Sequence, residues 1–128
     1  MKRLLLDTHV LLWWLSDDTR LGPIARRVIG DSKNLVYISA AIAWEISIKK
    51  SLGKLTAPDA IDVIVEERGF EKLPIALFHG DQAGALPNYH KDPFDRMLIA
   101  QAQSEGLVVV TSDEKISRYG IRTMEATK

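Results

Sequence analysis

"RLLLDTHVLLWWL", residues 3–15, joins two patterns whose order indicates the fold. Three consecutive leucines lead to Asp7, and a short run that is apolar on both faces and ends in a polar residue predicts a buried strand. A helix is predicted directly after it, because apolar side chains recur at helical spacing at Val10, Leu11, Trp14 and Leu15. A buried strand that passes at once into a helix is typical of the β-α-β units of parallel sheets.

The same alternation continues along the chain. Further strands are expected at residues 34–39, 70–75, 107–113 and 121–125. Further helices are expected at residues 21–30, 39–53, 56–69, 76–86 and 92–106. Pro74 places one strand at a sheet edge, and Pro58 is expected to open the helix that Gly69 closes. The pattern predicts an α/β fold: one domain, residues 1–128, with three α/β/α layers around a central parallel sheet.

The composition is that of a globular protein with no global preference for nucleic acid. Hydrophobic residues make up 46% and charged residues 27%, and 17 basic residues balance 17 acidic ones. The absence of cysteine excludes disulfides, thiolate catalysis and cysteine zinc sites. Asp7 and His9 interrupt the first apolar run, so we expect no signal peptide, no membrane anchor and a cytoplasmic location.

Two acidic residues end predicted strands. Asp7 follows the first strand, and Asp113 ends the strand at residues 107–113. Ligands of open α/β sheets bind beyond the carboxyl ends of the strands, which makes these positions candidates for a site. An aspartate at such a position also caps the helix or turn that follows, and this alternative stays open for each residue alone.

Two further acidic residues lie on predicted helices. Asp95 shares the core-facing stripe of its helix, although an acid in a first turn also gains from the helix dipole. Glu45 lies in mid-helix between apolar residues, and the alternative for it is an ion pair with Lys49, four residues on. Four carboxylates gathered in one cleft would repel one another unless a cation bound between them.

Oxygen ligands without cysteine favour a hard divalent ion, Mg²⁺ or Mn²⁺. Such ions activate water and neutralise charge on phosphate oxygens. The residues alone therefore indicate a metal-dependent enzyme of phosphoryl transfer or phosphodiester cleavage.

At this point the sequence resembles a family. "LLLDTHVLLW", "ISAAIAWEISIKKSLGKL", "HKDPFDRMLIAQAQSEGLVVVTSD" and "YGIR", in this order and spacing, are similar to the PIN-domain ribonucleases, and more narrowly to the VapC toxins of type II toxin–antitoxin pairs. The resemblance runs from about residue 2 to residue 125. It implies a parallel α/β fold, endonucleolytic cleavage of RNA with Mg²⁺ or Mn²⁺, a homodimer, and a cognate antitoxin protein that blocks the cleft.

The resemblance also implies the residues of the site. Its four catalytic acids match Asp7, Glu45, Asp95 and Asp113. We expect Asp7, Asp95 and Asp113 to hold the metal, and Glu45 to orient a water or complete a second metal site. Thr111 matches a hydroxyl residue near the last acid, and Glu114 is a neighbouring carboxylate that competes with Asp113 for the cleft.

Other features have two interpretations each. Arg96 adjoins Asp95 and is a candidate for binding RNA phosphate, although solvated helix faces also carry such cations. His9, His79 and His90 form no ligand pair by spacing. Two alternatives to a ribonuclease remain: a haloacid-dehalogenase-like phosphatase, whose second aspartate would stand where His9 is, and a non-catalytic PIN-like module that binds RNA or a protein partner.

Overall fold

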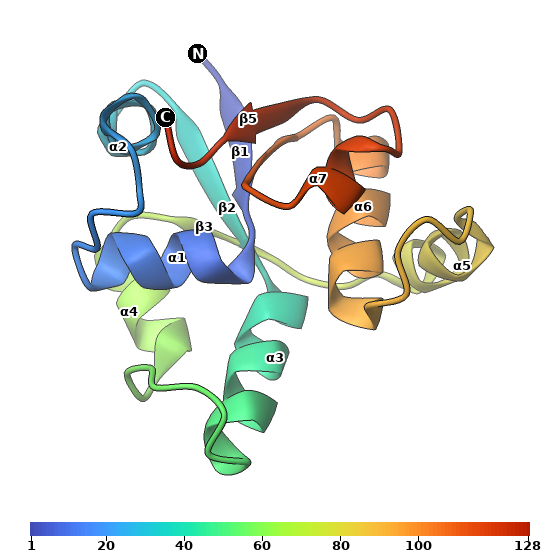
Figure 1. Ribbon diagram of the computed structural model, residues 1–128, viewed down its shortest axis with the longest axis horizontal. Coiled ribbons are helices and arrows are strands. Elements are labelled where there is room, and N and C mark those ends of the chain that lie inside the picture. The colour runs from blue at the N-terminus through green and yellow to red at the C-terminus, as the bar shows by residue number, and fades with distance from the viewer.

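Five parallel strands form one sheet in the order β3-β2-β1-β4-β5 in the computed structural model, which describes residues 1–128 (Figure 1). The strands are β1 Arg3–Leu6, β2 Leu35–Ser39, β3 Glu71–Leu73, β4 Val108–Thr111 and β5 Thr123–Glu125. All four neighbouring pairs are parallel, and β1 lies in the middle, where Leu5 pairs with Tyr37 on one side and with Val109 on the other. The predicted fold class is confirmed, and β3, which precedes Pro74, is an edge strand as predicted.

Seven helices flank the sheet. They are α1 Thr8–Leu15, α2 Pro23–Gly30, α3 Ala40–Ser51, α4 Ile61–Glu67, α5 Leu77–Ala85, α6 Pro93–Glu105 and α7 Glu114–Ser117. Figure 1 shows α1, α2 and α4 on one side of the sheet and α5, α6 and α7 on the other, which gives the expected three layers. Helix α3 projects beyond the ends of the strands and contacts both α1 and α6. No helix combines the length and the apolar character that a membrane crossing would need.

Several predicted boundaries were wrong. β3 ends at Leu73 instead of residue 75, and β5 begins at Thr123 instead of residue 121. Two other differences have a visible structural cause. The helix expected to open at Pro58 begins at Ile61, because Ala60 has a left-handed backbone (φ +56°) that a continuing α-helix does not accommodate. The last long strand ends at Thr111 instead of Asp113. There the chain turns, the amide of Asp113 donates to the Thr111 hydroxyl (3.0 Å), and a short helix, α7, follows that the sequence pattern did not predict.

The order of the strands creates a crevice beside β1. The chain passes from β1 to β2 in one direction and from β4 to β5 in the other, although β1 and β4 are neighbours. Connections that diverge from adjacent strands leave room at the carboxyl ends, where open α/β sheets bind ligands. The strand before this crevice is rigid, since Leu4, Leu5 and Leu6 are fully buried.

Candidate functional site

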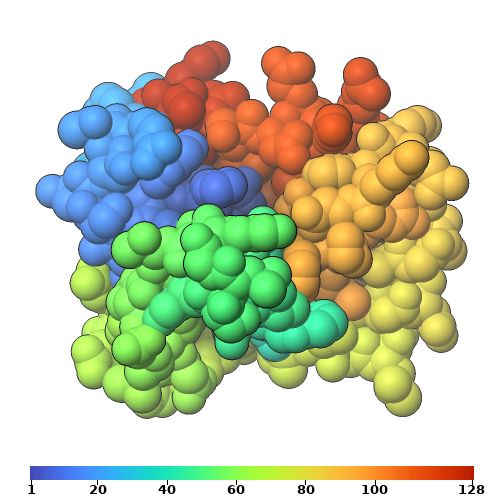
Figure 2. Space-filling view, turned by 60° about the horizontal axis from the view of Figure 1, so that its bottom comes forward, coloured from blue at the N-terminus to red at the C-terminus, as the bar shows by residue number.

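The four predicted acidic residues surround this crevice. Asp7 follows β1, Asp113 follows β4, Glu45 lies in the second turn of α3, and Asp95 lies in the first turn of α6. Each of them faces at least one of the others closely enough to repel it: Asp113 raises the pKa of Asp7, and Glu45 and Asp7 both raise the pKa of Asp95. Figure 2 shows this face, where the dark blue start of α1, the teal-to-green α3 segment and the orange α6 meet around a hollow.

Asp7 is held in place by two donors. Its Oδ1 accepts the amide of Val10 (3.0 Å) and so caps α1, while its Oδ2 accepts the hydroxyl of Thr111 (2.5 Å). The residue is only 7% exposed. Burial raises the pKa of Asp7, and the two hydrogen bonds oppose that rise without cancelling it.

Glu45 is equally buried and equally fixed. Its Oε1 accepts the hydroxyl of Thr8 (2.5 Å), and its Oε2 pairs with Lys49 Nζ at 2.7 Å. The predicted Glu45–Lys49 pair therefore forms, and it does not remove Glu45 from the site, because Lys49 also faces Asp92 and Asp95. These carboxylates raise the pKa of the Lys49 ammonium, with the hydrogen bond to Glu45 as the largest cause.

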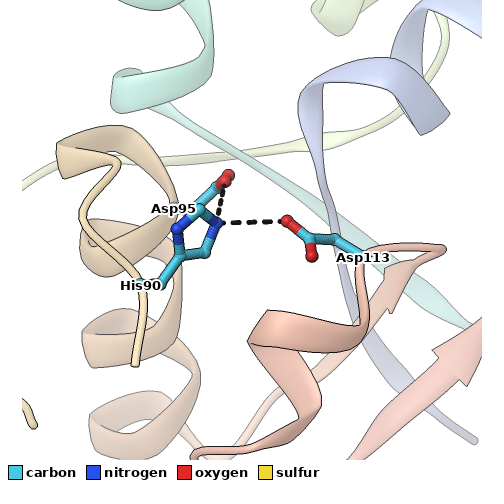
Figure 3. Close-up of side chains that lie close together, drawn as sticks. All are labelled: His90, Asp95 and Asp113. Carbon is cyan, nitrogen blue, oxygen red and sulfur yellow. Dashed lines mark hydrogen bonds and ion pairs between the residues drawn. The ribbon is translucent and has the colours of Figure 1, made fainter. Parts of the chain in front are cut away.

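Asp95 and Asp113 share a histidine. His90 Nε2 lies 2.8 Å from Asp95 Oδ2 and 3.1 Å from Asp113 Oδ2 (Figure 3). Asp92 caps α6 by accepting the amide of Asp95 (3.0 Å), and Asp113 caps α7 by accepting the amide of Lys115 (2.9 Å). Glu114 is exposed at the start of α7 and lies outside this cluster, so Asp113 is the carboxylate that reaches it.

The carboxylates of the site repel one another. Burial raises the pKa of Asp95 to about 7, and repulsion by Asp92 is the next largest cause. One oxygen each of Asp95 and Asp113 and a nitrogen of His90 lie within 4.8 Å of one another. Buried carboxylates that repel one another, with oxygens this close, fit a hard divalent cation such as Mg²⁺ or Mn²⁺.

The two residues predicted to bind substrate make their contacts inside the protein. Thr111 is buried and bonds to Asp7 and to the backbone of Asp113. The guanidinium of Arg96 donates to five backbone carbonyls, those of Ala83, Gly84, Leu86, Pro87 and His90. These contacts favour a structural role for both residues over the predicted contact with RNA.

His90 is the site residue that the sequence pattern missed. It lies in the loop between α5 and α6, where no periodicity indicates the direction of a side chain. The one available signal was its position two residues before the capping Asp92, which brings it near the first turn of α6.

Comparisons with known proteins identify the family. The sequence profile of the family described as PIN domain matches residues 4–122. The chain belongs to the PIN domain family. This assignment confirms the predicted resemblance and removes the phosphatase alternative.

Individual relatives match nearly the whole length of this PIN domain. It is 28% identical over 128 residues to Ribonuclease VapC22 of Mycobacterium tuberculosis, with 93% of each chain covered. Two solved structures have the same fold: a chain of DNA-bound VapBC from Salmonella typhimurium (24% identity, 97% and 98% covered, TM-score 0.67) and one of VapBC2 from Rickettsia felis bound to a promoter DNA fragment (12% identity, 95% and 97% covered, TM-score 0.68).

Proposed function

We propose that this PIN domain is a metal-dependent endoribonuclease, the toxin of a type II toxin–antitoxin pair, which cleaves RNA phosphodiesters. The observation that carries the proposal is the convergence of Asp7, Glu45, Asp95 and Asp113 on one crevice at the carboxyl ends of β1 and β4. The similarity to Ribonuclease VapC22 over nearly the full length supports RNA as the substrate.

We assign two roles to these side chains: the aspartates bind an ion, and Glu45 orients a water. Asp7, Asp95 and Asp113 would hold Mg²⁺ or Mn²⁺. A bound divalent ion lowers the pKa of water and offsets the charge that develops on a phosphodiester. Glu45 faces the same crevice from α3, and the bonds from Thr8 and Lys49 fix its carboxylate as an acceptor that orients the attacking water.

Thr111 acts on the site through Asp7. Its hydroxyl donates to one oxygen of Asp7 and accepts the amide of Asp113, so a single side chain aligns the acids that follow β1 and β4. Such supporting bonds fix the direction of a carboxylate and favour its ionised form.

The proposed partners are a cognate antitoxin and a second copy of this chain, in the cytoplasm. Beside the acids lies an apolar cavity of 350 Å³, lined by Trp44 and Phe94 among others. The Trp44 side chain packs edge-on against Phe94 at 5.2 Å, and the residue is 61% exposed. Exposed aromatic side chains next to a cleft are typical of protein interfaces, and the solved VapBC assemblies support an antitoxin as one occupant.

The test is RNA cleavage by the full chain purified without antitoxin. We expect cleavage of a labelled RNA with Mg²⁺ or Mn²⁺, none in EDTA, and none by Asp7→Asn with either metal. A protein that binds RNA but cuts none of a pool of transfer, ribosomal and messenger RNA would show the non-catalytic alternative to be right. Light scattering gives the oligomeric state of the same preparation.

A further inference from the structure

His90 joins two acidic residues that come from different parts of the fold. Asp95 lies on α6 and Asp113 precedes α7, and the His90 imidazole lies between them with Nε2 facing both carboxylates (Figure 3). The side chain is 11% exposed. Nε2 is hydrogen-bonded to Asp113 Oδ2 and lies in close polar contact with Asp95 Oδ2, and no other side chain contacts both carboxylates in this way.

The second ring nitrogen indicates which way these bonds run. His90 Nδ1 accepts the backbone amide of Asp92 at 3.4 Å. A ring nitrogen that accepts carries no hydrogen, so Nε2 bears the hydrogen, donates it to Asp113 and lies 2.8 Å from Asp95 Oδ2.

The loop that carries His90 is fastened to the same two elements as the acids. Arg96, on α6, donates to the carbonyl of His90 (3.1 Å) and to that of Pro87 (3.0 Å). The hydroxyl of Tyr119, which follows α7, accepts the amide of His90 (2.8 Å) and donates to Pro87 (2.7 Å). The backbone of His90 is therefore fixed relative to both α6 and the segment after α7.

We propose that His90 is a positioning residue, whose Nε2–H holds the carboxylates of Asp95 and Asp113 at one separation and so preforms the metal centre. The inference rests on the metal dependence proposed above. Without the imidazole between them the two carboxylates would repel each other and turn apart, and a metal would have to order them as it binds. Second partners of this kind change metal affinity by about 10–100-fold in other sites.

Two substitutions of His90 test whether the hydrogen-bond donor at Nε2 matters, or only the presence of a side chain. The amide nitrogen of glutamine reaches as far as Nε2, whereas that of asparagine reaches only as far as Nδ1. We therefore expect His90→Asn to weaken Mn²⁺ binding by about 10–100-fold, and His90→Gln to retain most of the affinity. His79→Asn is the matched control, because it makes the same substitution at a second buried histidine, which contacts none of the four acids.

Mn²⁺ affinity is measured without RNA, by electron paramagnetic resonance of the unbound ion, with melting temperatures in EDTA as the check on folding. Equal affinity of wild type and His90→Asn, or a gain in affinity, would overturn the positioning role while leaving the metal site intact. Directly coordinated nitrogen in the echo-modulation spectrum of bound Mn²⁺ would also overturn it, since His90 would then be a ligand. Failure of the wild type to bind Mn²⁺ would overturn the proposed metal dependence itself.

A substitution of Tyr119 tests whether the position of the His90 loop affects metal binding through His90. Tyr119→Phe removes the hydroxyl that bonds to His90 and Pro87 and should weaken Mn²⁺ binding several-fold. In the His90→Asn background the same change should have little further effect, because the residue it positions is gone. Tyr89→Phe is the control: Tyr89 packs against Tyr119 at 5.1 Å, and its hydroxyl makes no hydrogen bond in the structure. Fully additive losses would overturn this route.

Discussion

Replacing Asp95 with asparagine should stabilise the metal-free protein and abolish its activity. Burial and the neighbouring Asp92 raise the pKa of Asp95 to about 7, from an ordinary value of 3.8. The folded chain therefore holds this proton more tightly than the unfolded chain, and ionisation of Asp95 opposes folding. Stability of the wild type should fall as pH rises from about 4 to 7, and Asp95→Asn lacks this loss.

The size of the effect follows from the same values. At about 1.4 kcal/mol per pH unit, the full penalty is about 4 kcal/mol, of which about 2 to 3 kcal/mol develops between pH 5 and pH 8. Asparagine still offers an oxygen to His90, whose Nε2 lies 2.8 Å from Asp95 Oδ2, so that contact survives. The stability of Asp95→Asn relative to the wild type should accordingly grow by about 2 to 3 kcal/mol between these pH values.

Urea denaturation in EDTA, followed by the fluorescence of the three tryptophans, measures this difference. Asp81→Asn is the control: it makes the same change of charge at an exposed position on α5, and we expect it to alter the free energy of unfolding by less than about 0.5 kcal/mol at either pH. With Mg²⁺ added, the wild type should gain stability and the variant should not. A variant that is less stable than the wild type at pH 8 in EDTA, or a difference that stays constant with pH, would refute the reasoning.

Three further predictions concern the bonds around the acids. Thr111→Val removes the hydroxyl that lowers the pKa of Asp7, so the acidic limb of the pH–rate profile of RNA cleavage should move to higher pH; an unmoved profile would show that Asp7 does not limit the rate there. Glu45→Gln should lower kcat at least about 100-fold with little change in melting temperature, and unaltered kcat would exclude Glu45 from orienting water. Arg96→Lys should cost about 1–3 kcal/mol in urea denaturation because lysine cannot reach the five carbonyls, whereas weaker RNA binding at unchanged stability would restore the predicted substrate role.

The parts of the fold that follow periodicity could be predicted from the sequence. The leucines before Asp7 are buried on both faces, and a short apolar run of this kind is typical of a central parallel strand. The position of Asp95 on the core-facing stripe of its helix likewise predicted that it points inward, and its side chain is 21% exposed. Periodicity was sufficient to predict burial wherever the helix or strand itself determines the direction of the side chain.

The remaining features depend on contacts between distant segments. The loop that carries His90 has no repeating pattern, and its path is set by Arg96 and by Tyr119, which lies 29 residues away from His90. The start of α4 depends on Ala60, whose left-handed backbone no propensity indicates. In the segment before it, Asp59 pairs with Lys50 of α3. Such tertiary contacts are invisible to spacing within one element.

For Asp7 and Asp113, the sequence left helix capping and metal binding open as alternatives. The two roles do not exclude each other, because a carboxylate has two oxygens and capping uses only one of them. Asp7 caps α1 through Oδ1, and Asp113 caps α7 through Oδ1. The second oxygen of each faces the crevice, where it bonds to Thr111 or to His90. The capping hydrogen bond fixes the rotation of the side chain and leaves the second oxygen available. The starts of α1 and α7 therefore each orient a carboxylate toward the crevice. Asp95 caps no helix, because Asp92 caps α6. Burial and neighbouring charges raise the pKa of Asp95 to about 7. Burial raises the pKa of the capping Asp7 as well, so capping a helix does not spare a carboxylate the unfavourable charge that a cation would relieve.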